Sequence, residues 1–323
     1  MSVKDDVLEY LELNRGTAVS GGALAARLSV SRNAVFKAVC QLKDAGYVIE
    51  SSRGGYALSA SDNTLSEFVI CKFLAENKYN IHLYNEIPST NTALKEMAEH
   101  GAPEWTVAVA DHQTAGRGRL GRTFVSPAGT GIYTSVLLRP EIPLEKVTLI
   151  TVAAAVAAVR SIEKHSKKNA EIKWVNDVYV DEKKVSGILT EASFDAELSK
   201  ISYAVVGVGI NVAAPRGGFT GDAKGIAGAL FDTATAELRA AILGDFLNFF
   251  SEYYENGLDC AIDFYRKKQY LVGRRAEISR GGESTVVDVL GVDENCALVV
   301  KYPDGKTERI TSGDVSVHAE RDR

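Results

Sequence analysis

The stretch KWVNDVYVDEKKVSGILTEA, residues 173–192, decides the fold. Two apolar, strand-like runs at 172–180 and 185–190 follow each other here across a short charged turn, with no helix between them. The neighbouring sequence holds further elements: strand-like runs at 107–110, 132–138 and 203–208, and helical stretches at 91–100 and 144–165. Because consecutive strands without crossover helices do not build a doubly wound sheet, we predict an α+β fold around a mixed central sheet.

The least common motif in this region is GRGRLGR, at 116–122. Its glycines satisfy the pattern GxGxxG, yet a dinucleotide-binding fingerprint requires a helix directly after the loop. Here residues 123–131 contain a proline and two glycines and lead into a strand, so the dinucleotide interpretation fails. The HRD and DFG motifs of protein kinases are absent from the sequence as well.

Three arginines, Arg117, Arg119 and Arg122, alternate with the glycines of this loop. Glycine lets backbone N–H groups approach an anion, and the guanidinium group matches phosphate and carboxylate oxygens in a bidentate manner. A solvated surface loop is the alternative, but three neighbouring cations repel one another when no anion is present. We therefore expect this loop to bind an anionic ligand.

The first sixty residues predict a winged helix-turn-helix. Apolar spacing indicates two helices, a third that begins at the N-cap candidate Ser31, and then two short strands around Arg53. In this motif the third helix enters the DNA major groove and the hairpin touches the backbone, so the candidate DNA contacts are Ser31, Arg32, Asn33, Lys37 and Arg53. Six basic and two acidic residues at 15–53 give a local charge of +4, although a protein-docking module remains the alternative.

Composition changes divide the chain into three parts. The polar segment SASDNT at 59–64 predicts a linker after a DNA-binding domain at 1–62. A catalytic domain is expected at 65–270. Short alternating strands at 276–317 predict a small β-barrel within a C-terminal domain at 271–323.

Length and composition exclude several classes of protein. A chain of 323 residues, 46% of them hydrophobic, folds around two or three cores, and its net charge of −5 gives no overall basic character. Four dispersed cysteines and five dispersed histidines match no zinc site or disulfide framework. The N-terminus lacks the apolar run of a signal peptide, and the most apolar stretch, at 148–159, is too short to span a membrane. We expect a cytoplasmic protein with reduced thiols and no membrane partner.

Five motifs together resemble the family of bifunctional biotin–protein ligases and biotin operon repressors. They occur in the family's order: STN at 89–91, QTAGRGRLGR at 113–122, KWVND at 173–177, KKVSGIL at 183–189 and GVGINV at 207–212. The winged-helix outline before them and the β-rich tail after them extend the resemblance over nearly the whole chain. Val175 departs from the family, in which proline is common at this position, and we expect little effect on the chemistry.

The resemblance implies a two-step reaction. The carboxylate of biotin attacks the α-phosphorus of ATP, which releases pyrophosphate and gives biotinyl-5′-adenylate. A lysine of a biotin carboxyl carrier protein domain then attacks the activated carbonyl. The implied ligands are ATP, biotin and Mg²⁺. The resemblance further implies an SH3-like C-terminal barrel and a biotin-responsive repressor that binds operator DNA as a homodimer in its adenylate-bound state.

The family's site residues carry over onto matching positions of this chain. The implied catalytic residues are Arg119, Asp177 and Lys184, and Asp177 is also the candidate Mg²⁺ ligand. The implied biotin pocket comprises Ser89, Thr90, Asn91, Gln113, Gly116, Arg117, Gly118, Arg119, Lys184 and Gly187. The implied adenylate side comprises Arg122, Lys173, Asn176, Gly207, Gly209 and Asn211. At its glycines we expect missing side chains to admit the ligand close to the backbone. Phe219 is a further candidate, which would stack on adenine.

Three other functions stay open at the level of sequence: a ligand-sensing repressor without ligase activity, a ligase whose N-terminal module no longer binds DNA, and a lipoate–protein ligase. The intact Arg119, Asp177 and Lys184 argue against the first. A salt-dependent DNA titration tests the second. Pyrophosphate exchange driven by biotin or by lipoate tests the third.

Overall fold

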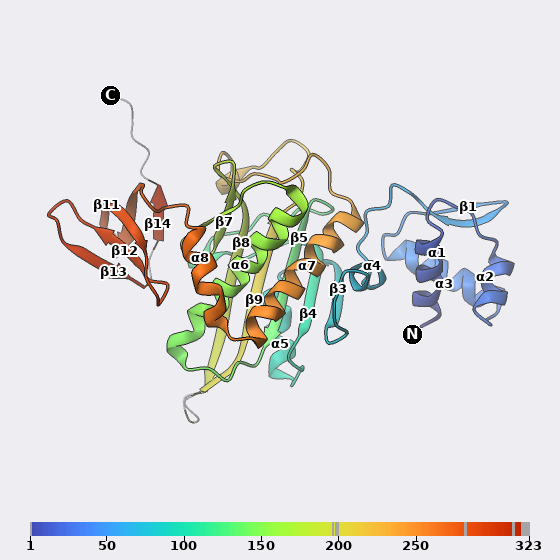
Figure 1. Cartoon of the computed structure of the whole chain (residues 1–323). Coiled ribbons are helices and arrows are strands. Elements are labelled where there is room, and N and C mark those ends of the chain that lie inside the picture. The colour runs from blue at the N-terminus through green and yellow to red at the C-terminus, as the bar shows by residue number, and fades with distance from the viewer. Residues whose placement is uncertain (1, 196, 198–199, 281–282, 312–313, 318–323) are drawn as a thin grey trace.

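A computed structural model describes residues 2–195, 197, 200–280, 283–311 and 314–317. Residues 281–282, 312–313 and 318–323 of the predicted C-terminal domain therefore lie outside the described residues. The chain runs from a small helical unit, through a large central unit of sheet and helices, to a small sheet at the opposite end (Figure 1).

The N-terminal unit consists of three helices and a two-stranded wing. Its elements are α1 (Val3–Leu13), α2 (Gly21–Arg27), α3 (Arg32–Asp44), β1 (Ile49–Ser52) and β2 (Gly55–Leu58). The side chains of Ser2, Ser20 and Ser31 each accept a hydrogen bond from a backbone N–H in the first turn of the following helix. A separate apolar core, which includes Leu11 and Val35, holds the unit together. The predicted winged helix-turn-helix is confirmed.

The central unit is built on a seven-stranded sheet in the order β3-β4-β5-β9-β8-β7-β6. Its strands are β3 (Asn80–Ile87), β4 (Thr106–Gln113), β5 (Gly131–Leu138), β6 (Glu171–Lys173), β7 (Asp177–Val180), β8 (Lys183–Asp195) and β9 (Lys200–Asn211). β3 and β4 run parallel, and the other neighbours are antiparallel. The predicted α+β fold with a mixed sheet is confirmed.

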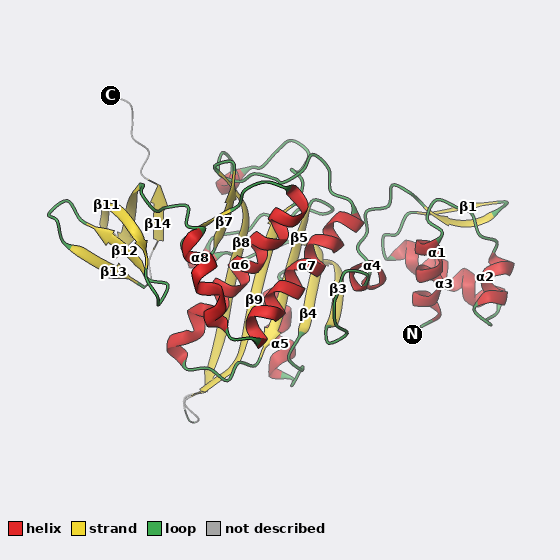
Figure 2. Cartoon of the chain, viewed as in Figure 1, coloured by secondary structure: helices red, strands yellow, loops and turns green. Residues whose placement is uncertain are grey.

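Helices cover the two faces of this sheet unequally (Figure 2). The long helices α6 (Val147–Ser166) and α7 (Ala236–Glu255) form a layer on one face, joined by the short helices α4 (Glu67–Cys71) and α8 (Ile262–Lys267), and α5 (Thr90–Glu99) packs on the other. The alternation of β9 shows both faces, because Val208 belongs to the larger core whereas Val205 packs with Leu94 of α5. Beyond Val205, β9 continues on the α5 face with Gly207 and Gly209, which carry no side chains of their own.

The apolar stretch at 148–159 lies within α6, where nearly every side chain is buried between the sheet and α7. None of the described helices combines the length and the apolar composition that crossing a membrane requires.

One strand prediction was wrong, and one strand was missed. The single strand predicted at 172–180 is two strands, β6 and β7, which pair antiparallel with Lys173 opposite Asp177. Apolar alternation does not distinguish a long strand from a tight hairpin whose turn is itself buried, as Trp174 is here. Strand β3 was not predicted, because this edge strand is largely exposed and has no clear apolar face.

The C-terminal unit is a five-stranded antiparallel sheet in the order β13-β12-β11-β10-β14. Its strands are β10 (Arg275–Arg280), β11 (Glu283–Val292), β12 (Leu298–Lys301), β13 (Thr307–Ile310) and β14 (Asp314–Val317). The antiparallel sheet agrees with the sequence, whereas its closure into an SH3-like barrel remains a prediction.

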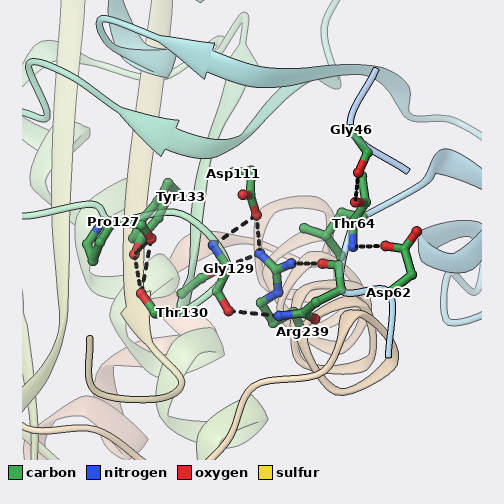
Figure 3. Close-up of polar contacts among 12 residues, drawn as sticks. Gly46, Asp62, Thr64, Asp111, Pro127, Gly129, Thr130, Tyr133 and Arg239 are labelled. Atoms are coloured by element: carbon green, nitrogen blue, oxygen red, sulfur yellow. Dashed lines mark hydrogen bonds and ion pairs between the residues drawn. The ribbon is translucent and has the colours of Figure 1, made fainter. Parts of the chain in front are cut away.

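A buried polar joint connects the N-terminal and central units (Figure 3). Arg239 of α7 is fully buried, donates to Oδ1 of Asp111 at 2.7 Å, and donates to the backbone carbonyl of Asn63 in the linker. The same Asp111 oxygen accepts the N–H of Gly129 at 3.2 Å, and the carbonyl of Gly129 accepts the Asn63 side-chain amide at 2.9 Å. The linker is therefore tied to the loop that leads into β5.

Candidate functional site

A cavity of about 700 Å³ lies over the part of the sheet that α5 leaves free. Every ligand-site residue predicted in the central unit lines this cavity, with the exception of Gly116. Gly116 instead packs against the far end of the same loop, where an added Cβ would come within 2.3 Å of the Phe124 carbonyl oxygen. Its glycine therefore allows two backbone segments to approach each other.

One end of the cavity is a network of neutral polar groups at the start of α5. The backbone N–H of Thr90 donates to Oε1 of Gln113 at 2.9 Å, and the hydroxyl of Ser135 on β5 donates to Oδ1 of Asn91 at 2.6 Å. The Asn91 amide in turn donates to Glu191 at 2.9 Å. Ser89, Thr90 and Asn91 are all buried, so the network is fixed in place. Such a set of paired donors and acceptors suits an uncharged polar ring.

The glycines of β9 also make room for side chains of the protein itself. An added Cβ on Gly207 would lie 2.1 Å from Oδ1 of Asn91, and one on Gly209 would lie 2.3 Å from the ring of Phe124. The space above these glycines is thus used by the protein's own side chains. Both glycines nevertheless line the cavity, and the expectation that they admit ligand close to the backbone stays a prediction.

The register of β8 and β9 arranges the cavity in rows. Gly207 pairs with Leu189 at the Asn91 end, and Gly209 pairs with Gly187 one row further along. Beyond Gly187, Lys184 lies with its Nζ 2.7 Å from Oδ2 of Asp177. The neutral end and the cationic end are therefore separated along the strands.

The cationic end is built from the glycine-rich loop at 116–122 and the KWVND motif at 173–177. Arg119, in the short 3-10 turn after Gly118, donates to Oδ1 of Asn176 at 2.9 Å. The Asn176 amide group donates to the carbonyl of Ile188 at 2.9 Å and to Oδ1 of Asp177 at 3.0 Å. These bonds bring Arg119 of the glycine-rich loop to the hairpin that carries Asp177 and Lys184.

Glu191 ties α5 to the glycine-rich loop and was missed by sequence reasoning. Its carboxylate accepts from Asn91, pairs with Lys95 at 3.0 Å and with Arg117 at 3.3 Å. Burial by itself would raise the pKa of Glu191, but the hydrogen bonds from Asn91 and Lys95 outweigh it and hold the pKa below its ordinary value of 4.5. A carboxylate two residues beyond GIL, on the same strand face as Gly187, was the signal available in the sequence.

The glycine-rich loop folds back on itself over the cavity. The N–H of Gly118 donates to the carbonyl of Arg122 at 2.7 Å, and the N–H of Phe124 donates to the carbonyl of Gly116 at 2.9 Å. Arg122 and Phe124 both line the cavity, and Phe124 is the second residue that sequence reasoning missed. An aromatic residue two positions after the last arginine gave no signal by itself.

A second loop, at 213–228, borders the cationic end. The backbone N–H of Lys184 donates to the carbonyl of Ile226 at 2.9 Å, and the side-chain amide of Asn211 donates to the carbonyl of Gly228 at 3.1 Å. Phe219 of this loop also lines the cavity. Lys173 reaches the same cavity, with its Nζ 5.7 Å from the centre of the Tyr179 ring.

The C-terminal unit contacts the turns at both ends of β7. The Trp174 indole N–H donates to the carbonyl of Cys296 at 2.8 Å. Arg274 pairs with Glu182, in the turn before Lys184, at 2.9 Å. Donation from Arg274 and from the Tyr270 hydroxyl lowers the pKa of Glu182. These two contacts hold β7, which carries Asp177, from outside the central sheet.

The predicted DNA-binding residues of the N-terminal unit are all exposed. Arg32, Asn33 and Lys37 of α3 and Arg53 of the wing are exposed. The Ser31 hydroxyl is engaged as the cap of α3, since it accepts the N–H of Ala34 at 3.1 Å.

Three family patterns match consecutive parts of the chain. Residues 4–57 match an HTH domain, residues 83–211 match the biotin/lipoate A/B protein ligase family, and residues 272–317 match the biotin protein ligase C terminal domain. The order of the three matches is the order of the three structural units.

Curated relatives match over nearly their whole length. The bifunctional ligase/repressor BirA of Bacillus subtilis is 32% identical over 326 residues, which cover 98% of this chain and 99% of that protein. BirA of Escherichia coli is 26% identical over 319 residues, which cover 95% of each protein. Among solved structures, a biotin protein ligase from Aquifex aeolicus in complex with biotin and ATP has a TM-score of 0.61 at 26% identity, and the match covers 74% of this chain and 98% of that chain.

Proposed function

Because this chain belongs to the family of bifunctional biotin–protein ligases and biotin repressors, we propose how its own residues carry the reaction and its regulation. The chain is an ATP-dependent biotin–protein ligase with an N-terminal DNA-binding repressor domain. The observation that supports our assignment of residues is the single cavity that joins a neutral polar end to a cationic end.

We assign the neutral end to the ring system of biotin. Thr90, Asn91 and Gln113 offer hydroxyl and amide groups, which match the donors and acceptors of a ureido group. Ser89, Arg117 and Gly118 complete this part of the pocket in our proposal, and Gly116 contributes through the fold of the loop. Biotin's carboxylate then points along the strands, past Gly187, to Lys184.

We assign the first step to the cationic end. The biotin carboxylate attacks the α-phosphorus of ATP, a new oxygen–phosphorus bond forms, and pyrophosphate leaves with the electron pair of the broken bond. Two anions have to meet in this step, so cations that reduce their repulsion and hold them in line lower the barrier. Lys184 and Arg119 provide that charge, while Arg122, Lys173, Asn176, Gly209 and Asn211 border the adenylate.

In the second step the amine of an acceptor lysine attacks the carbonyl of the adenylate, an amide bond forms, and AMP leaves. The acceptor is a biotin carboxyl carrier protein domain in our proposal. The carboxylate of Asp177 lies 2.7 Å from the ammonium of Lys184. We propose that Asp177 orients the incoming amine. The glycine-rich loop excludes water from the hydrolysable mixed anhydride.

Magnesium fits this site as a partner of ATP. The described residues contain no cluster of three or more acidic, histidine or cysteine side chains. The oxygens of Asp177 bind Lys184 and Asn176, and no second acidic ligand was predicted. Since Mg²⁺ is commonly held by one or two carboxylates together with phosphates and water, we propose Asp177 as the protein carboxylate beside it. The ion would neutralise charge on the triphosphate.

We propose that adenylate-bound copies form a homodimer and place two N-terminal units on a palindromic operator. Arg32, Asn33 and Lys37 would enter the major groove, and Arg53 of the wing would contact the phosphate backbone. Ser31 would contribute through the position of the helix that it caps. The four cysteines are free thiols, which supports a cytoplasmic protein.

The reaction is tested by exchange of labelled pyrophosphate into ATP, with biotin or lipoate as the acid. We expect exchange with biotin only, and biotin transfer to a purified carrier domain. Exchange driven by lipoate would overturn the choice of substrate. Binding of a duplex that does not increase with biotin and ATP would overturn the regulatory part alone.

A further inference from the structure

Phe36 is an exposed aromatic residue on the third helix of the N-terminal unit. Its exposed fraction is 56%, although phenylalanine is among the most frequently buried residues. It is absent from the side chains that form or line the core of this unit. Within the described part of the chain its ring meets no other ring and no cation.

The position of Phe36 on α3 places it among the predicted DNA contacts. Arg32 and Asn33 lie one turn before it and Lys37 directly follows it, and all three are exposed. Val35 and Val39 of the same helix belong to the buried core of the unit, whereas Phe36 does not. The ring is therefore exposed on the same stretch of α3 as the cations Arg32 and Lys37 and the amide of Asn33.

The charge around Phe36 identifies the class of partner. Residues 4–57 match an HTH domain, and the exposed charged side chains beside Phe36, Arg32 and Lys37, are the cations that a helix in a DNA major groove uses to contact phosphates. Inside the major groove the only apolar group presented by a base edge is the C5 methyl of thymine. Phenylalanine is one of the side chains that contact this methyl group.

We propose that Phe36 reads thymine in the operator half-site through its C5 methyl group. The inference rests on the proposed repressor function and adds a specificity-determining residue to it. Asn33 and Lys37 supply polar contacts beside it, and Phe36 discriminates thymine from cytosine by apolar contact.

The experiment removes one methyl group at a time. The full-length protein with biotin and ATP selects its preferred duplex from a random pool, and each thymine of that duplex is then replaced by uracil, which lacks only the methyl. In each half-site, one replacement is expected to weaken binding by the wild type about three- to tenfold, the size expected for one buried methyl group. Phe36→Ala is expected to bind more weakly and to be indifferent to that replacement.

The matched control is Phe194→Ala, because Phe194 is also an exposed phenylalanine, at 46%, but lies on β8 of the central unit. This variant should keep the wild-type response to uracil. The proposal is overturned if no thymine is sensitive in the wild type, or if folded Phe36→Ala retains the sensitivity. Selection of no sequence by the wild type would overturn the repressor function itself, and Phe36's role with it.

Discussion

The ammonium of Lys184 lies 2.7 Å from the carboxylate of Asp177, across the two antiparallel strands that end at the cavity. The turn between these strands is only two residues long, and both of them, Asp181 and Glu182, have positive φ. The tight turn fixes the register, and the ion pair then fixes the lysine. A cation placed before the substrate arrives does not have to be reorganised during the reaction.

Replacement of this lysine should abolish the first step of the reaction. We expect Lys184→Ala to lower biotin-dependent pyrophosphate exchange by about 100-fold or more, the usual cost of losing a preorganised electrostatic contact. The measurement is the rate of exchange at saturating ATP and biotin.

The adjacent Lys183 provides the control, because its Nζ donates to the Gly225 carbonyl at 2.6 Å and it is exposed. Lys183→Ala should retain exchange within about threefold, as expected for a surface contact. Equal losses in both variants would indicate a general effect of positive charge and contradict a specific role for Lys184.

The packing of Asn91 against Gly207 leads to a second prediction. A methyl group at Gly207 would overlap Oδ1 of Asn91, so Gly207→Ala should displace the amide from Ser135 and Glu191. We expect the KM for biotin to rise about tenfold or more, since one displaced polar contact costs about 1–3 kcal/mol. The KM for ATP should change much less.

Steady-state kinetics with each substrate varied in turn measures the two constants. Gly291→Ala is the control, because a Cβ at Gly291 meets nothing within 4 Å. An unchanged biotin KM in Gly207→Ala would show that Asn91 does not contact biotin.

The outcome of the sequence predictions follows from the range of the interactions involved. Helix caps such as Ser31 depend on near neighbours, and the winged-helix outline was therefore predictable. The site motifs lie at or near the ends of strands that belong to one sheet, so pairing of those strands brings the motifs close together. The pairing of Glu191 with Arg117 crosses 74 positions of sequence, and the packing of Phe124 on Gly209 depends on the path of a loop, so neither left a local pattern.

The lowered pKa of Glu191 predicts a particular dependence of stability on pH. A carboxylate whose pKa is lower in the folded protein stabilises the fold above its unfolded value of about 4.5, and this contribution disappears as the pH falls through the folded value. The glutamine side chain in Glu191→Gln does not ionise, so this variant lacks the contribution at every pH. Its melting temperature should lie about 2–4 °C below the wild type at pH 7, as expected for about 1 kcal/mol in a chain of this size.

The difference in melting temperature between the wild type and Glu191→Gln should be constant from pH 7 to about pH 5. It should become smaller below about pH 4.5. Thermal melts across this range provide the measurement. Glu86→Gln removes an exposed carboxylate paired with His112 and serves as control. A gap between wild type and Glu191→Gln that widens in acid would have the wrong sign and reject the assignment.

The buried Arg239 joint predicts the largest loss of stability. Arg239→Met keeps an unbranched apolar stem but removes the donors to Asp111, Gly131 and Asn63. Breaking a buried ion pair by removing one partner costs about 3–5 kcal/mol, because the other charge is left without compensation. We expect the central unit to melt at a clearly lower temperature, and protease cleavage in the linker at 59–64 to accelerate, since the backbone carbonyl of Asn63 loses its hydrogen bond from Arg239.

The double variant Arg239→Met with Asp111→Asn separates the ion pair from the loss of packing. Because Asp111→Asn removes the charge that Arg239→Met leaves unpaired, the double variant should be less destabilised than the sum of the two single variants. Lys146→Met, which breaks an exposed pair with Asp259, should cost at most about 1 kcal/mol. Equal melting temperatures and equal rates of linker cleavage in Arg239→Met and Lys146→Met would contradict this prediction. They would show that the buried Arg239 contributes no more to stability than an exposed ion pair does.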